Sequence, residues 1–405
     1  MLWFSSLVLL ICRLTVECGA QQLKEEIYSD IENIRPCFRR MNSTHQIGCS
    51  SEIGGNVGVV IYLETEADLE KLKDNEFAPY VVLVDPYIFN SELLHKLEAS
   101  GLCAGVVLPN IKTGKWAGHY PRQGYSDDAR TDWNPVGQGT MWHDWAFPIF
   151  YLENSTVAEQ VHSCYSDHND LAELAWPLCS LELKSNMYGS GDSQTCLRRS
   201  SLFSISPVRV CDPLSDDNIH YFLSPRLREN PEDPGSVVVV AAKMDALALF
   251  DQVEVGFDSP ATGIVTLLSV ASAVSKAVKN NPRYRDGISN VLFLLIHGES
   301  FDHIGSTRLV DDMMKSGFPF NNSDPSVIEK SKNGSQPNFS LENIHSFIEL
   351  DQLVNINNNK AVYVHSNNNP ADIVSLMKQN KGELKVSEVP NNLPPSSSQS
   401  FLAKR

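Results

Sequence analysis

Two continuous apolar runs, residues 237–242 and 291–296, constrain the fold of this chain more than any other feature. An uninterrupted apolar run is typical of a strand that is buried on both faces of a sheet. Between the runs, Ser259 suits a helix N-cap and Pro260 the first helical position. Apolar residues then recur at helical spacing: Ile264, Leu267, Leu268, Ala271, Val274 and Val278. This strand–helix–strand order predicts an α/β fold with parallel strands.

The first half of the chain predicts a second unit of the same class. Short apolar runs at 57–63, 80–84 and 104–108 surround a helical pattern at 91–99, in which Leu93, Leu94 and Leu97 share one face. A Pro-rich connector at 225–235 predicts the boundary between the units. We therefore expect a signal peptide at 1–20, a small α/β lobe at 21–225 and a large lobe at 226–405. In the large lobe we expect a mixed sheet with flanking helices. Its Asn-, Pro- and Ser-rich end predicts no closing element, so we expect it to be incomplete at the C-terminus.

The N-terminal segment predicts export. Residues 2–14 are mostly apolar, and small residues near Ala20 offer a cleavage point. A membrane anchor is the alternative, but this run is too short to span a bilayer. The run at 291–296 is shorter still, and we expect no transmembrane helix in this chain. N-x-S/T sequons predict glycosylation at Asn42, Asn154, Asn321, Asn333 and Asn338.

The charge of the chain limits the partners it can bind. Its formal net charge is −16 at pH 7. Nucleic acid binding needs Lys and Arg to neutralise phosphates, and anionic lipid attracts basic segments. We therefore exclude nucleic acid as a partner and flat binding to an anionic membrane.

The spacing of the cysteines predicts disulfide bonds. In an exported chain we interpret Cys37 with Cys49, Cys164 with Cys179 and Cys196 with Cys211 as pairs. Each closes a short loop, which would stabilise the fold by roughly 3 kcal/mol in the chain-entropy account. Buried free thiols are the alternative. Cys103 has no partner in this scheme.

Residues 115–145, here called the aromatic loop, have no periodicity and contain four tryptophans: Trp116, Trp133, Trp142 and Trp145. A long irregular loop of this kind is often functional, and its aromatic content favours packing over another surface. We expect either a lid over a binding site or local packing of the tryptophans in the core of the small lobe.

Polar residues gather where the strands of the large lobe end. The segments 243–245, 256–263 and 297–305 follow or precede predicted parallel strands, and ligands bind beyond the carboxyl ends of such strands. The third segment brings Glu299, Asp302, His303 and Ser306 close together in sequence. We therefore expect a functional site at this edge of the sheet.

Four stretches of the large lobe resemble the zinc aminopeptidases that use two metal ions. They are VVVVAAKMD (237–245), GFDSPATG (256–263), FLLIHGES (293–300) and FIELDQ (347–352). The resemblance implies that Lys243 replaces a ligand histidine, Ser259 a bridging aspartate and Ser300 a ligand glutamate. Asp258, next to Ser259, leaves that register open. Asp245, Glu299 and Asp351 remain, but carboxylates beside a lysine are a poor zinc site, so we expect no metal and no cofactor.

A second resemblance covers most of the chain. The motif FDHIGS, made of Phe301, Asp302, His303, Ile304, Gly305 and Ser306, is similar to the signature of the nicastrin family. CLRRSS (196–201), CDPLSD (211–216) and DWNPVGQG (132–139) resemble the same family, in the same order. The resemblance implies a glycosylated, non-catalytic subunit of the γ-secretase intramembrane protease. Its implied partners are presenilin, the two other small membrane subunits, and the substrates Notch and amyloid precursor protein. The implied location is the lumenal or extracellular side of the secretory pathway and plasma membrane, with a type I anchor in a full-length chain.

The resemblance also implies roles for single residues. Glu299 matches a position proposed to contact the amino terminus of the substrate; Asp302 lies beside it, and Trp133 matches a lid position. The alternative is that Glu299 and Asp302 only hold the loop by hydrogen bonds. His303 stands where the family has tyrosine, and we expect it at the surface. If Arg405 ends the chain, a soluble secreted binding module is an alternative function. An active zinc aminopeptidase is less favoured, because Lys243, Ser259 and Ser300 oppose a metal site.

Overall fold

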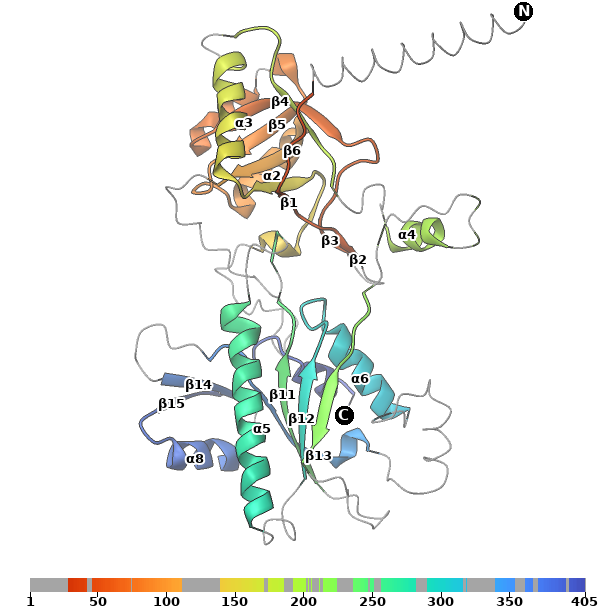
Figure 1. Ribbon diagram of the computed structural model, residues 1–405, viewed down its shortest axis with the longest axis vertical. Helices are drawn as coiled ribbons and strands as arrows, with labels where there is room; N and C mark the ends of the chain where they lie inside the picture. The colour runs from red at the N-terminus through yellow and green to blue at the C-terminus, as the bar shows by residue number, and fades with distance from the viewer. Residues whose placement is uncertain are drawn as a thin grey trace, which may run out of the picture.

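The computed structural model describes residues 28–41, 46–73, 75–110, 139–170, 174–185, 192–201, 203, 205, 211, 214–223, 236–246, 248–250, 256–281, 290–315, 318, 339–353, 361–366, 371–390 and 393–404. The predicted signal peptide, the connector at 225–235 and most of the aromatic loop lie outside these residues. So do Trp133 and the sequons at Asn42, Asn321, Asn333 and Asn338. The described residues form two α/β lobes, stacked along the long axis of the molecule (Figure 1).

The first lobe is built on a six-stranded sheet. Its order is β1 (Ile34–Pro36), β8 (Ile149–Leu152), β6 (Cys103–Pro109), β5 (Tyr80–Val84), β4 (Asn56–Leu63) and β9 (Ser180–Leu183). The four central strands are parallel, and β1 and β9 run antiparallel at the two edges. Every residue of β5 is buried, which explains its uninterrupted apolar sequence. The predicted strands at 57–63, 80–84 and 104–108 are therefore present.

Helices and short turns connect these strands. The 3₁₀ turns η1 (Glu66–Leu72) and η2 (Asn75–Phe77) precede β5, and α2 (Ser91–Ser100) and α3 (Ser155–His168) pack beside the sheet. Asn90 caps α2 by accepting a hydrogen bond from the Leu93 amide, and Gly101 ends the helix in a left-handed conformation. Leu93, Leu94 and Leu97 are buried, as the helical pattern predicts.

A small second sheet joins β2 (Arg40–Met41), β3 (Gln46–Cys49) and β7 (Asp144–Trp145), the last of which follows the 3₁₀ turn η3 (Thr140–Trp142). Trp145 is fully buried and its indole N–H donates to the Thr140 carbonyl at 2.9 Å. Of the two alternatives for the tryptophans of the aromatic loop, a lid or local packing in the core, Trp145 therefore shows local packing.

The predicted cysteine pairs are joined in the structure. Cys37–Cys49 and Cys164–Cys179 belong to the core of the first lobe, and Cys196–Cys211 tethers α4 (Ser193–Ser200). The Cα atoms of the three pairs are 5.6, 5.8 and 6.0 Å apart, within the usual range for disulfides. Cys103 is a free thiol, and burial raises its pKa to about 12.

The second lobe contains a four-stranded mixed sheet. Its order is β10 (Ile219–Phe222), β12 (Asn290–Ile296), β11 (Val237–Lys243) and β13 (Ile344–Glu349), the last preceded by the 3₁₀ turn η6 (Leu341–Asn343). β11, β12 and β13 are parallel, and β10 pairs antiparallel with β12. Residues 219–222 lie before the expected lobe boundary between residues 225 and 226, yet backbone hydrogen bonds hold them in the sheet of the large lobe.

The two faces of this sheet carry different helices. Leu309, Val310 and Met313 of α6 (Ile304–Met314) pack against one face, while Leu267 of α5 (Thr262–Asn280) packs against the other. The prediction that Ser259 caps α5 is wrong. α5 begins at Thr262 after the helical turn η4 (Phe257–Ala261), within which Ser259 is extended, with φ −140° and ψ 122°.

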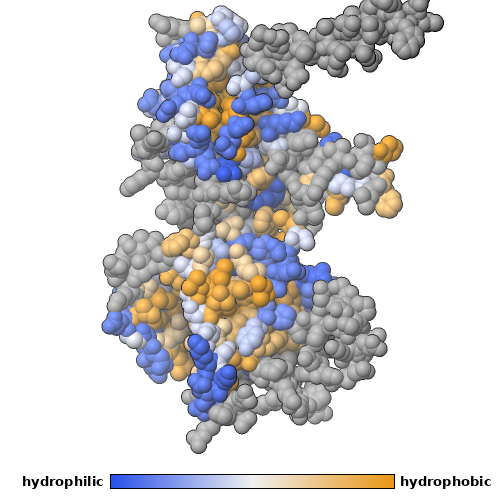
Figure 2. Space-filling model, in the orientation of Figure 1, coloured by the Kyte–Doolittle hydropathy of each residue, from blue (hydrophilic) through white to orange (hydrophobic). Residues whose placement is uncertain are grey.

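The apolar pattern of α5 is only partly buried. Leu267 is 2% exposed, but Leu268 is 54% and Val265 63% exposed. Figure 2 shows apolar side chains over the first part of this helix and polar side chains toward its end. The stretch Phe257–Asn280 also has the length and hydropathy to cross a membrane, contrary to the expectation that no segment does. However, α5 links β11 and β12, which pair directly in one sheet, so it runs back alongside that sheet.

The end of the chain is more ordered than its composition predicts. β14 (Ala361–Ser366) and β15 (Lys385–Pro390) form a parallel pair that is connected through α8 (Ala371–Asn380). The short helix α9 (Ser398–Leu402) packs on α6, and its Phe401 belongs to the core of the large lobe. The expectation of no closing element is therefore wrong for this segment.

Contacts between the lobes involve the residues after β11 and the loop before α6. Phe250, which follows β11 in the chain, is buried in the core of the first lobe and forms a backbone bridge with Cys37. Arg40 of β2 donates to the Ala248 carbonyl at 3.0 Å, and its guanidinium lies 5.2 Å from the ring centroid of Phe301. The FDHIGS motif thus begins against the first lobe.

Candidate functional site

The carboxyl ends of β11, β12 and β13 bring the polar residues of the large lobe together. Backbone hydrogen bonds from Met244 to Ile296 and from Leu350 to Ala241 fix the register of the three strand ends. Lys243 and Asp245 come from β11 and the residues after it, Glu299 and Ser300 follow β12, and Asp351 follows β13. The prediction that the three segments meet at this edge is confirmed.

Asp245 is the first anchor of the site. It is 9% exposed, and its two carboxylate oxygens accept the backbone N–H groups of Glu299 at 2.9 Å and Ser300 at 2.7 Å. The Ser300 hydroxyl donates to the Asp245 carbonyl at 3.1 Å. Asp245 therefore shapes the turn after β12, and both of its oxygens are engaged by the protein.

Lys243 and Ser259 converge on Asp351. The Lys243 ammonium lies 3.4 Å from Oδ1 of Asp351, and the Ser259 hydroxyl donates to the same oxygen. Thr262 donates to the Asp351 carbonyl at 3.0 Å, which ties this strand end to the start of α5. Of the two residues whose register is open, Asp258 and Ser259, the structure shows Ser259 in contact with Asp351.

Glu299 caps α6 from the preceding turn. Its side chain is 2% exposed; one oxygen accepts the Ser306 amide at 2.7 Å, and the other lies 3.0 Å from Nδ1 of His303. Ser306 is the third residue of α6, so the carboxylate satisfies an N–H that has no partner within the helix. Both Glu299 oxygens therefore have protein partners.

The Glu299–His303 pair is mostly buried. The His303 side chain is 20% exposed, so the expectation that it lies at the surface is wrong, because Glu299 draws the ring inward. Burial opposes ionisation of Glu299, but the hydrogen bond and charge of His303 outweigh it and lower the pKa of Glu299. Burial likewise disfavours the imidazolium, yet the same bond and charge raise the pKa of His303. Each partner favours the charged form of the other.

The backbone of the FDHIGS motif is sharply turned. Asp302 and His303 both have positive φ, 62° and 54°, a conformation that costs energy for residues other than glycine. Gly305 packs directly against the His297 carbonyl, and a Cβ there would overlap its oxygen. The glycine therefore permits the close approach of the strand end and α6.

Glu349 is a member of this site that the sequence analysis does not single out. Ser397 donates to its Oε1 at 3.2 Å, while its Oε2 is buried and has no hydrogen-bond partner among the residues that the structure describes. Burial, reinforced by the charges of Asp351 and Glu299, raises the pKa of Glu349 to about 7. The sequence does hold a signal for Glu349: it lies two residues before Asp351 in FIELDQ, and the alternation of a β-strand puts both side chains on one face.

Asn218 is a second missed residue. Its Oδ1 accepts the His297 amide at 2.8 Å and its Nδ2 donates to the Gly305 carbonyl at 3.2 Å. It thereby bridges the end of β12 and the start of α6. No local pattern in the sequence predicts this contact, which spans 79 and 87 residues of chain.

The donor set does not fit the two zinc ions of an aminopeptidase. A metal ion would have to displace the Lys243 ammonium from Asp351 and the backbone amides from Asp245. Of the other predicted functional residues, Trp133 lies outside the described residues, and Asn154 is exposed and caps α3 through the Thr156 amide. Instead of a metal site, the residues at the strand ends of the large lobe form a fixed, charged loop at the junction of the lobes.

Comparison with known proteins identifies relatives of both lobes. The model of the nicastrin small lobe matches residues 36–189, and that of the nicastrin large lobe matches residues 236–405. Nicastrin of Homo sapiens is 33% identical over 431 aligned positions, which cover 96% of this chain and 57% of that protein. Nicastrin of Dictyostelium purpureum is 25% identical, covering 94% of this chain and 59% of its own length.

A solved structure has the same fold. The crystal structure of the gamma-secretase component nicastrin superposes with a TM-score of 0.67 at 24% identity, covering 93% of this chain and 66% of that one. The chain thus spans somewhat more than half the length of the curated relatives.

Proposed function

Because the chain belongs to the nicastrin family, we propose that it acts as a non-catalytic subunit of the γ-secretase intramembrane protease complex. Two family models match the two lobes in order, and a solved relative of the same fold is a component of that complex. In this proposal the chain stabilises the assembly and recognises or gates substrates such as Notch and amyloid precursor protein.

The contact of Lys243 with Asp351 carries the non-catalytic part of the proposal. A zinc peptidase needs an open metal position at which water is activated. Here an ammonium stands beside the carboxylate that would bind the metal. Repulsion between the Lys243 ammonium and a metal ion opposes metal binding at this site.

We assign Glu299 a positioning role for the FDHIGS motif (residues 301–306), here called the signature loop. Its carboxylate is engaged by Ser306 and His303, which leaves it poorly placed to bind the ammonium of a substrate directly. By capping α6, Glu299 sets the conformation of Asp302, which is only partly buried and stays the better candidate for substrate contact. Trp133 remains a predicted lid residue.

Presenilin and the two other small membrane subunits are the partners in this proposal. The disulfides and the predicted sequons support a place on the lumenal or extracellular side of the secretory pathway and plasma membrane. Exposed Asn154, at the start of α3, is accessible to a glycan.

Native co-purification tests the subunit function. An antibody against the small lobe would isolate the endogenous protein from membranes in mild detergent, and mass spectrometry would identify the chains that accompany it. We expect presenilin in stoichiometric amounts. Recovery of the protein without presenilin, under conditions that keep the complex intact in a control purification through presenilin itself, would contradict the proposal.

An enzyme assay tests the non-catalytic part separately. The secreted full chain would be incubated with aminoacyl p-nitroanilides in the presence of zinc, beside an active zinc aminopeptidase. We expect no hydrolysis above that of a Glu299→Gln variant. Zinc-dependent turnover that this substitution abolishes would overturn the non-catalytic assignment.

A further inference from the structure

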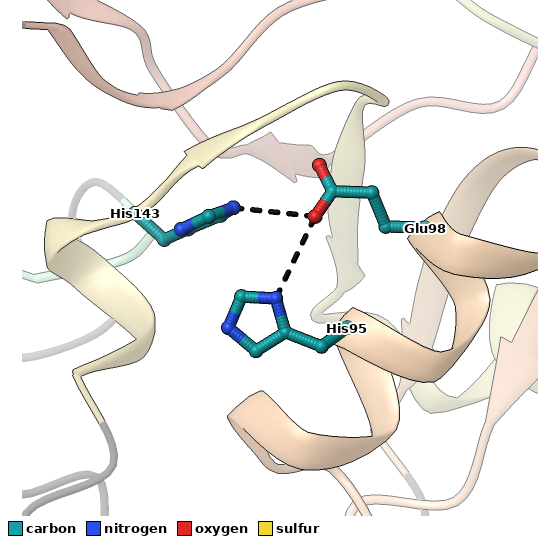
Figure 3. Close-up of side chains that lie close together, drawn as sticks. All are labelled: His95, Glu98 and His143. Atoms are coloured by element: carbon teal, nitrogen blue, oxygen red, sulfur yellow. Dashed lines mark hydrogen bonds and ion pairs between the residues drawn. The ribbon is translucent and has the colours of Figure 1, made fainter.

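Three potential metal ligands meet on the first lobe, away from the site described above. His95 and Glu98 lie one helical turn apart near the end of α2, which places them on the same face. His143 comes from the residue between η3 and β7. Figure 3 shows both imidazoles directed at the carboxylate of Glu98.

Two of the three separations between ligand atoms are close to those expected around a shared cation. Nε2 of His143 lies 3.3 Å and Nδ1 of His95 lies 3.5 Å from the same oxygen, Oε2 of Glu98. Charge-assisted hydrogen bonds are usually about 2.7–2.9 Å long. In a tetrahedral zinc site with bonds of about 2.0–2.1 Å, neighbouring ligand atoms are about 3.3–3.4 Å apart. The ligand atoms of the cluster all lie within 4.8 Å of one another.

The surroundings hold these side chains in place. Trp145 is fully buried, with its ring centroid 4.2 Å from that of His143 and 5.0 Å from that of His95. The His143 carbonyl accepts the Gly48 amide at 2.8 Å, next to the disulfide-bonded Cys49. The second oxygen of Glu98 accepts the Ala146 amide at 3.4 Å. Metal sites depend on such outer partners to orient their ligands.

We propose that His95, Glu98 and His143 form a zinc-binding site on the first lobe. Two imidazoles and one carboxylate are a common ligand set for Zn²⁺, with the fourth position taken by water. The half-exposed His95 side chain leaves the site open to the solvent, and the net charge of −16 favours cation binding. The bound ion joins α2 to the residue that precedes β7 and so fastens the end of the aromatic loop to the lobe.

Zinc titration of the full secreted chain tests this site. Metal would be removed with a chelator, and Zn²⁺ binding measured by calorimetry in competition with a chelator of known affinity. We expect one tight site, with His143→Ala and Glu98→Gln each weakening binding by about 10-fold or more, because each removes one of three ligands. Glu92→Gln, on the same helix, and His345→Ala, an exposed histidine of the second lobe, are matched controls and should bind zinc like the unmodified protein.

A spectroscopic measurement makes the test independent of the variants' folding. X-ray absorption of the zinc-loaded, unmodified chain should show N/O ligands at about 2.0–2.1 Å with scattering from two imidazoles. Absence of tight binding by the unmodified chain would overturn the proposal. So would equal affinity of the folded His143→Ala and Glu98→Gln variants, or a spectrum without imidazole.

Discussion

The ammonium of Lys243 lies 3.4 Å from Oδ1 of Asp351, across the carboxyl ends of the neighbouring strands β11 and β13. A fixed cation thus balances one carboxylate of the site. The same two charges act in opposite directions on Glu349: Asp351 raises its pKa and Lys243 lowers it, on top of the larger effect of burial. The protonation of Glu349 therefore reports the charge balance at this edge of the sheet.

Glu349→Gln should remove a pH dependence of stability. With a folded pKa of about 7, against 4.5 for the free side chain, Glu349 holds its proton in the folded state when the unfolded state has lost it. Its contribution to stability therefore falls as the pH rises from about 4.5 to about 7. At pH 8 we expect the variant to be more stable by at most about 3 kcal/mol. Denaturant unfolding from pH 5 to pH 8 measures this.

A Lys243→Met variant tests the same assignment of the pH dependence to Glu349 in a second way. The lysine favours ionisation of Glu349, so its removal should raise the pKa of Glu349 further and move the stability loss to higher pH. Glu342→Gln, at an exposed position, is the matched control and should leave the profile of the unmodified protein unchanged. If Glu349→Gln keeps the same slope as the unmodified protein, Glu349 does not carry the proton.

His303→Tyr should remove a second, separate pH dependence. The pKa of His303 is raised in the folded state, mainly because the bond to Glu299 outweighs burial. Its contribution is fully present below the unfolded pKa, about 6.5, and is lost as the pH rises through the folded value. We expect the variant to lose about 1–2 kcal/mol of stability at pH 6 and less at pH 8.5.

That measurement is best made in the Glu349→Gln background, because both groups weaken the fold as the pH rises. His345→Tyr is the control, since His345 is exposed and its ring contacts only Ser346 among the hydrogen bonds described. An equal loss of stability at pH 6 and pH 8.5 would contradict a role for the charge of His303.

The parts of the fold that the sequence predicts are those with a local period. β4, β5, β6, β11 and β12 are apolar runs, and α2 has its leucines on one face, so each element could be placed from its own residues. β10 could not, because all four of its residues are at least partly exposed and it exists through pairing with β12. The start of α5 was misplaced because Ser259 is drawn to Asp351, 92 residues away.

The residues of the candidate site likewise fall into those that the sequence predicts and those that it does not. Strand order placed Asp245, Glu299 and Asp351 at one edge, since parallel strands end together. The inward turn of His303 and the bridge made by Asn218 depend on partners that the sequence does not reveal. The zinc-site candidate shows both cases: His95 and Glu98 share a helical face, but His143 joins them through the tertiary fold, 45 residues after Glu98.

Gly305→Ala should be among the most damaging single substitutions in the large lobe. A Cβ at this position overlaps the His297 carbonyl oxygen, so the end of β12 and the start of α6 would have to separate. The hydrogen bonds of Asn218 to both segments and the cap from Glu299 would then be lost. We expect a loss of more than about 4 kcal/mol, visible as failed secretion.

Gly54→Ala is the control for that substitution, because a Cβ at Gly54 meets no atom within 4 Å. It should change stability by no more than about 0.5 kcal/mol, as is usual at open surface positions. Normal secretion and an unchanged melting temperature of Gly305→Ala would show that the strand end can move freely from α6.

Glu299→Gln should separate the cap of α6 from its charge. Glutamine keeps the oxygen that accepts the Ser306 amide but loses the negative charge that pairs with His303 and favours the helix N-terminus. We expect a stability loss of about 1–2 kcal/mol near pH 6, where both partners are charged in the folded protein. Because the pKa of Glu299 is lowered, its contribution is present above the unfolded pKa, about 4.5, and disappears as the pH falls through the folded value.

The unmodified protein and Glu299→Gln should therefore converge in stability toward acid pH, in addition to losing the His303 contribution toward alkaline pH. A double-mutant cycle with His303→Tyr measures the coupling between the two side chains directly. Strong coupling at pH 6 that fades on both sides of that pH would establish the pair as the support of the signature loop. Coupling near zero at pH 6 would mean that the Ser306 amide alone explains the buried position of Glu299.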